Sequence, residues 1–171
     1  MYDPTVFENL KVAFENRVYD LDNLERTINI VNRTDQLDVA VMSRKFTIRF
    51  SLVGQPAVIG EIVLHSSLQE LADEILEVDG AEPGCLLSLR VLKNVQDLDT
   101  ECEQIEQVLQ AIWENDIDYR QTLSFQYNQT EPGFLNTITI VFKPKLTEDH
   151  MGEIGEFLEH VVEMLTRIGD L

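Results

Sequence analysis

Apolar residues at helical spacing mark four stretches of the chain. Asp3-Pro4 is a typical helix start, and Val6, Leu10 and Phe14 follow at steps of four residues. A first helix is therefore expected over residues 4–17. The same spacing predicts three more helices: a short one that begins at Ser67 and ends near Gly80, a third over about residues 98–114, and a last one from Thr147 to Ile168.

Other stretches alternate between apolar and polar residues or are rich in β-branched residues, which is typical of strands. Four of them are separated only by short, turn-forming segments, so they predict an antiparallel meander. The run 85–92 is apolar nearly throughout, which suggests a strand buried on both faces. The expected strands lie at about residues 27–31, 37–42, 46–52, 58–64, 85–92, 119–127 and 134–142.

The predicted order is α-ββββ-α-β-α-ββ-α, which is an α+β fold with antiparallel sheet and helices packed on one face. The length of 171 residues fits a single domain over residues 1–171. The sequence also contains a weak internal repeat, because residues 46–76 and residues 123–165 both predict the order strand, turn, strand, acidic helix. This pattern indicates either an old ββα duplication or two ordinary α+β halves.

Charge is the strongest compositional signal. The net charge is −18, and residues 66–118 alone hold fourteen acidic against two basic side chains. DNA and anionic membranes are therefore not expected as partners, because carboxylates repel phosphate. The acidity favours solubility, or else attraction of a basic protein partner. Adaptation to high salt is less consistent with a chain rich in Ile, Leu and Asn.

Cysteine content and the absence of targeting patterns predict a cytoplasmic protein. Cys85 and Cys102 are the two cysteines, too few for a disulfide framework, so both thiols are expected to be reduced. The first residues show no signal peptide, and no apolar run is long enough to span a bilayer. The glycosylation sequons at Asn32 and Asn128 are then without consequence.

The three histidines do not fall in any known metal-binding spacing. His160 shares a helical face with Glu156 and Glu163, but this face lies opposite the apolar stripe and is expected to be solvated. His150 lies among acids in a first helical turn, where carboxylates complement the helix dipole. The sequence therefore assigns no metal, cofactor or catalytic residue.

Nucleophile and phosphate-binding patterns are also missing from the sequence. Ser67 is better explained as a helix N-cap, and Cys102 as a small residue on an apolar stripe. Cys85 follows Pro83-Gly84 and is expected to be the more exposed thiol. Gly152 and Gly155, inside a helical pattern, suggest that a strand or a partner packs closely against the start of the last helix.

The basic residues Arg44, Lys45 and Arg49, with Arg33 across a predicted turn, form the only cationic cluster. Phe46 is interleaved with them, as is Phe50, which raises the alternative of an RNA-binding sheet. On a strand, however, these aromatic residues share a face with Ile48 and Leu52. The pattern favours a solvated sheet face above a packed one.

Three functions remain open. The first is a non-catalytic interaction protein that is adaptor-like, chaperone-like or regulatory, is a homodimer through the C-terminal helix, and binds a protein partner, possibly a basic one. In element order and acidity alone, without a shared motif, the chain resembles the small acidic α/β dimers that chaperone secreted effector proteins in bacteria; this resemblance implies dimerisation and a protein client.

The second function is a small-molecule-binding protein or enzyme with an apolar pocket between sheet and helix. Its walls would be drawn from the aromatic residues Phe125, Tyr127, Phe134 and Phe142. The third is a divalent-cation protein that uses the acidic helices, although no calcium-loop pattern is present.

Overall fold

A computed structural model describes residues 5–171, so the expected helix start at Asp3-Pro4 lies outside the described part. One six-stranded sheet has the order β1-β2-β3-β4-β6-β5, and all neighbouring strands are antiparallel. The elements along the chain are α1 (Thr5–Asn23), β1 (Ile28–Asp38), β2 (Ser43–Leu52), β3 (Gln55–Ser66), α2 (Leu68–Ile75), β4 (Leu86–Val95), α3 (Leu98–Trp113), β5 (Ile117–Ser124), β6 (Phe134–Phe142), the 3-10 helix η1 (Glu148–Glu153) and α4 (Ile154–Gly169).

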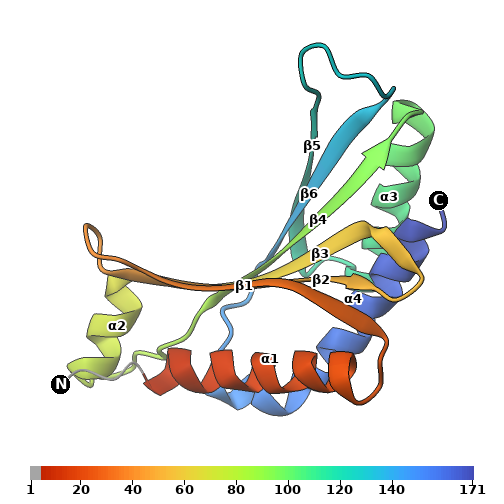
Figure 1. Ribbon diagram of the computed structural model, residues 1–171. Helices are drawn as coiled ribbons and strands as arrows, with labels where there is room; N and C mark the ends of the chain where they lie inside the picture. The colour runs from red at the N-terminus through yellow and green to blue at the C-terminus, as the bar shows by residue number, and fades with distance from the viewer. Residues whose placement is uncertain (1–4) are drawn as a thin grey trace.

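The sheet is strongly twisted, and α1, α3 and α4 lie along one of its faces (Figure 1). The short helix α2 lies at one end, close to the β1–β2 hairpin in this view. The α+β class, the antiparallel sheet and the general order of elements are confirmed. The opposite face of the sheet carries no helix in the described residues.

The first expected strand, 27–31, continues through residues 32–35 as a single strand, β1, which ends at Asp38; residues 39–42 of the second expected strand form the turn that follows. Residues 32–35, which the sequence suggested as a turn, pair in register with Arg49 to Phe46 of β2. The pairing shifts between Ile30 and Asn32, as in a β-bulge, and the chain then continues as strand. Asn and Asp are turn formers by local preference, but an edge strand tolerates polar residues because one side of it faces solvent.

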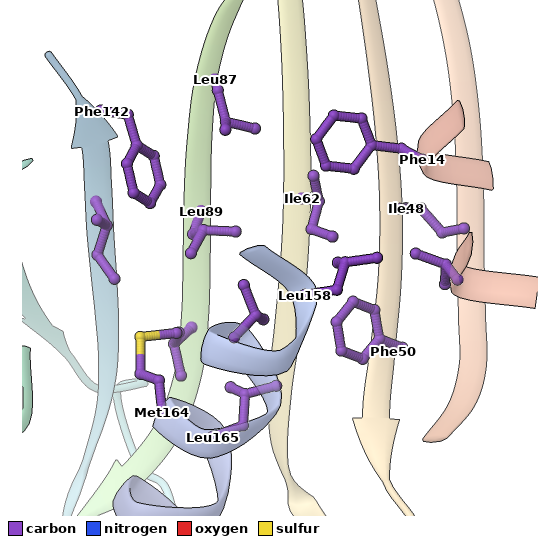
Figure 2. Close-up of a cluster of buried hydrophobic side chains, with 14 of the residues drawn as sticks. Phe14, Ile48, Phe50, Ile62, Leu87, Leu89, Phe142, Leu158, Met164 and Leu165 are labelled. Atoms are coloured by element: carbon purple, nitrogen blue, oxygen red, sulfur yellow. The ribbon is translucent and has the colours of Figure 1, made fainter. Parts of the chain in front are cut away.

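The core lies between the sheet and the three helices. Buried residues alternate along β4, β6 and most of β2, whereas Gly60 to Leu64 of the central strand β3 are all buried. The buried apolar residues form one connected cluster with α1, α3 and α4. Figure 2 shows Ile48, Ile62 and Leu89 side by side on neighbouring strands, facing α4. The expectation that β4 is buried on both faces is wrong: buried and less buried residues alternate along it, because its outer face is not covered by a second layer.

The apolar stripe of α4 is part of this core. Leu158, Val161, Met164, Leu165 and Ile168 are all at most 1% exposed. The stripe belongs to the core and is covered by the chain's own sheet, α1 and α3. Self-association of the chain stays a prediction.

Gly152 of η1 and Gly155 of α4 do not mark a close contact, contrary to expectation. A Cβ at Gly152 would meet nothing within 4 Å, and one at Gly155 would meet only the Arg17 Nε at 3.7 Å. Helix and sheet approach closely at two other glycines. A Cβ at Gly60 of β3 would come within 2.8 Å of the Leu165 side chain, and one at Gly169, the last residue of α4, would come within 2.5 Å of the Gln55 side chain of β3.

Helix α1 runs longer than expected because its apolar stripe continues through Val18 and Leu21, both buried. It is tied to the β1–β2 hairpin by ion pairs: Lys11 with Asp35 at 2.9 Å, and Arg44 with Glu8 at 2.7 Å. Burial alone would raise the pKa of the Glu8 carboxyl, but the hydrogen bonds and charges of Arg44 and Lys11 outweigh it and lower that pKa.

Candidate functional site

Acidic and basic residues are segregated in the fold. The six strands together carry seven basic and four acidic side chains, whereas the helices and connections of residues 5–171 carry six basic and twenty-six acidic ones. The net charge of −18 therefore comes from the helices and the segments between elements. A charged partner meets a different field at the sheet than at the helices.

The helix-free face of the sheet carries an ion-paired row at its centre. The Glu61 carboxylate, itself largely buried, lies 2.8 Å from the Arg49 Nη2 and 3.4 Å from the Arg90 Nη1.

The aromatic residues of β2 lie on the other face of the sheet. Phe46 and Phe50 are fully buried there, as expected. An RNA-binding sheet needs exposed aromatic residues, and these two do not provide them. Arg33 and Arg44 also point to the helix side, where they pair with Glu15 and Glu8.

The β1–β2 hairpin ends in an apolar tip. Leu37, Val39, Val41 and Met42 are all exposed, although β2, which follows the tip, buries Phe46, Ile48 and Phe50. The sequence suggested that 37–42 is a strand with one buried face. In the structure the strand β1 ends at Asp38, and the following residues form the turn.

Helix α2 is attached to the rest of the protein largely through its polar side. Its Glu74 accepts the backbone N–H of Val6, and its Glu70 accepts the backbone N–H of Gly84 and pairs with Lys145 at 3.1 Å. The N-cap expected at Ser67 is confirmed. Leu71 is the one buried residue of the helix.

The apolar face of α2 consequently stays open. Leu68, Ile75 and Leu76 are exposed, Leu76 by 72%, and Val78 just beyond the helix is exposed as well. An amphipathic helix normally buries its apolar face, so the exposed apolar face of α2 is a candidate binding surface.

The hairpin tip and α2 leave the sheet at the same end. Ser66, the last residue of β3, pairs with Arg44 near the start of β2, and α2 begins at Leu68. We call these residues together the hairpin–α2 surface: Leu37, Val39, Val41, Met42, Leu68, Ile75, Leu76 and Val78. Eight of the nineteen exposed large apolar residues of the described chain belong to it, which makes it the strongest candidate site for binding.

Acidic side chains surround this surface. Residues 68–82 hold six acidic and no basic side chains. Glu70 and Glu74 are engaged in the contacts that hold α2. Glu77, Asp79 and Glu82 are exposed, so the apolar surface has a negatively charged rim.

The histidines are dispersed over the structure. His65 lies on the outer face of β3, opposite Lys45. The ring of His160 packs edge-on against Trp113 at 5.8 Å, so it is half-buried and not fully solvated as expected, while Glu156 and Glu163 are exposed. In residues 5–171 no three His, Cys, Asp or Glu side chains converge to hold a metal ion.

Neither cysteine has the surroundings of a nucleophile. Cys85 is fully buried, contrary to the expectation that it is the more exposed thiol, because it bridges to Leu146 next to the strand end. Burial, with the nearby charges of Glu70 and Glu74, raises the pKa of its thiol to about 12. Cys102 is half-buried on α3, and burial together with adjacent acids raises its pKa too.

The four aromatic residues proposed as pocket walls do not converge. Phe125 and Tyr127 are exposed in the connection between β5 and β6, and the ring of Phe134, the first residue of β6, packs edge-on against Phe125 at 5.7 Å. Phe142 alone is buried in the core, where it lines an apolar pocket beside α4. Sequence reasoning missed the other pocket residues because they come from four separate elements.

Comparisons with known proteins add no relatives: the chain matches no family model, no curated protein and no solved structure. Among the described residues, no helix has both the length and the apolar character needed to cross a membrane. Arguments about function therefore depend on the surfaces and the pocket of this chain alone.

Proposed function

We propose that this protein is a non-catalytic, acidic interaction protein of the cytoplasm, and that it binds a basic, amphipathic segment of another protein through the hairpin–α2 surface. The observation that carries the proposal is the exposed apolar face of α2, a helix held to the fold by its carboxylates. Burying this face against a partner supplies the affinity.

Charge complementarity selects the partner. Apolar side chains of the segment cover Leu68, Ile75 and Leu76, and its Lys or Arg residues meet the rim acids Glu77 and Asp79. Two copies of this protein would instead bring six negative charges from each α2 region together. This repulsion argues for a foreign partner at this surface and against a homodimer through it.

The proposal can be tested with a synthetic amphipathic peptide of leucine and lysine, and with its leucine–glutamate counterpart. Fluorescence anisotropy at 50 and 300 mM salt gives the dissociation constants. We expect the lysine peptide to bind, and the Ile75→Ser/Leu76→Ser variant to bind it at least tenfold more weakly, since each change removes an apolar contact worth about 1 kcal/mol or more.

Matched controls separate this surface from general acidity. Leu24→Ser/Val53→Ser removes two similarly exposed apolar side chains elsewhere, and it should leave binding unchanged. Glu77→Gln/Asp79→Asn should weaken binding and reduce its salt dependence, whereas Glu156→Gln/Glu159→Gln on α4 should have a smaller effect. Equal losses in the surface and control variants would refute the proposal.

The solution mass, from light scattering at low and high salt, tests the competing homodimer. A monomer at both salt concentrations supports the proposal that the hairpin–α2 surface binds a different protein. A dimer that Ile75→Ser/Leu76→Ser converts to a monomer would overturn the proposal, because a second copy would then occupy the surface.

A further inference from the structure

An apolar pocket lies where the start of α4 meets the ends of β4 and β6. Its volume is about 210 Å³, and its walls include Phe14 from α1, Leu87 from β4, Phe142 from β6 and Phe157 from α4. In Figure 2, Phe14, Leu87 and Phe142 lie in the upper part of the buried cluster, whereas Met164 and Leu165 lie in its lower part. The pocket is thus on the opposite side of the core from the C-terminal half of α4.

The aromatic walls hold one another in place. The Phe157 ring packs edge-on against Phe14 at 5.9 Å and against Phe142 at 5.3 Å. Phe142 also packs edge-on against Trp113 at 5.0 Å. Rings that are fixed by their neighbours lose little freedom when a ligand binds, so the pocket is preorganised for a flat apolar body.

Among the side chains that line the pocket, His150 offers a hydrogen-bond donor that no acceptor in residues 5–171 takes up. The Nδ1 of His150 accepts the backbone N–H of Thr147 at 2.9 Å, which means that the neutral ring carries its proton on Nε2. In residues 5–171 this Nε2 makes no hydrogen bond. It is therefore able to donate one to an acceptor on a ligand.

The charges at the pocket disfavour an anion. Lys145 is the one basic residue of the lining, and its Nζ is held by both Glu70 carboxylate oxygens at 3.1 and 3.2 Å. Glu153 adds a further negative charge. A carboxylate or phosphate entering here would meet net repulsion.

We propose that this pocket binds a small, uncharged molecule with a flat apolar body and a single oxygen acceptor directed to the Nε2–H of His150. A cavity of about 150 Å³ holds benzene, so 210 Å³ corresponds to about eight or nine heavy atoms. The site is separate from the hairpin–α2 surface, and the proposal does not depend on the protein partner.

The test uses acetophenone, which is uncharged and carries one carbonyl acceptor, with cumene as its equal-sized apolar counterpart and benzoate as the anion. Titration followed by amide chemical shifts gives both the affinity and the location. We expect acetophenone and cumene to shift residues around Phe142, His150 and Phe157, and benzoate to bind at least tenfold more weakly than acetophenone.

Two variants make the result decisive. Leu146→Trp places a larger side chain at a half-buried wall position and should abolish binding of both uncharged probes. His150→Asp keeps an oxygen that can accept the Thr147 N–H but has no N–H to donate; it should weaken acetophenone about three- to tenfold and leave cumene unchanged. Shifts located elsewhere, no saturation by 5 mM, or equal loss of both probes in His150→Asp would overturn the proposal.

Discussion

Replacing Leu158 by alanine tests directly whether α4 belongs to the core. Leu158 is 1% exposed and lies between Ile62 and Phe50 in Figure 2. Removal of a fully buried leucine side chain costs about 3–5 kcal/mol, from lost transfer energy and from the cavity left behind. A domain of this size has a total stability on the order of 5–15 kcal/mol, so the loss is a large share of it.

The assay is urea unfolding followed by circular dichroism, with thermal unfolding alongside. For Leu158→Ala we expect a lower urea midpoint at an unchanged slope, and a melting temperature reduced by about 6–20 °C. The control Leu24→Ala, at a residue 75% exposed, should change stability by no more than about 0.5 kcal/mol.

The reasoning would be refuted by a loss below about 1 kcal/mol in Leu158→Ala. It would also be refuted if the melting temperature depended on protein concentration in the original protein but not in the Leu158→Ala variant. That behaviour is the signature of a subunit contact that has been removed, not of a core that has been weakened.

Three further predictions concern single sites. The pKa of the Glu8 carboxyl is lowered in the folded protein from its ordinary 4.5, so the ion pair of Glu8 with Arg44 stabilises the fold above that pH and is lost as pH falls through the folded pKa. In Arg44→Met, urea midpoints between pH 6 and pH 3 should therefore fall less steeply than in the original protein. Parallel curves for the two proteins would contradict this. Gly155→Ala should raise stability by about 0.5–1 kcal/mol, since the new Cβ has room within a helix; a lower melting temperature would show that it has not. Glu61→Gln should cost about 1 kcal/mol at low salt and less at 1 M salt, because its partner Arg90 is partly exposed and salt screens the pair; a loss that did not vary with salt would argue against an electrostatic cause.

Local features of the fold follow from the sequence closely. The helix spacing predicts α1, α2, α3 and α4 in order, and the Ser67 N-cap is confirmed by its bond to the Glu70 N–H. The alternation over 46–52 correctly separates Phe46, Ile48 and Phe50 from Arg49. These patterns are readable because neighbours three, four or two residues apart share a face in any helix or strand.

Boundaries are less well predicted where tertiary pairing competes with local preference. Residues 32–35 prefer a turn by themselves, but hydrogen bonds to β2 hold them as a strand. Helix α3 begins at Leu98, as expected, and its N-cap is Asp97. Several polar residues in this segment can cap a helix, and the position of the preceding strand β4 selects among them.

The candidate sites depend almost wholly on tertiary structure. The stripes of α2 and α4 look alike in sequence, yet α4 is buried and α2 is open. The difference arises because α4 crosses the sheet at Gly60, whereas α2 is held at the sheet's end by Glu70 and Glu74. The spacing of apolar residues along a helix does not indicate which neighbouring element, if any, will cover them.

The sequence by itself therefore determined the class of fold, the order of its elements and the acidity of its helices, because these are set by local spacing and composition. Tertiary structure decided which apolar face stays exposed, that Cys85 is buried, and that His150 and Phe142 meet around one pocket. These outcomes join residues far apart in the chain, and only the packing of the whole molecule brings them together.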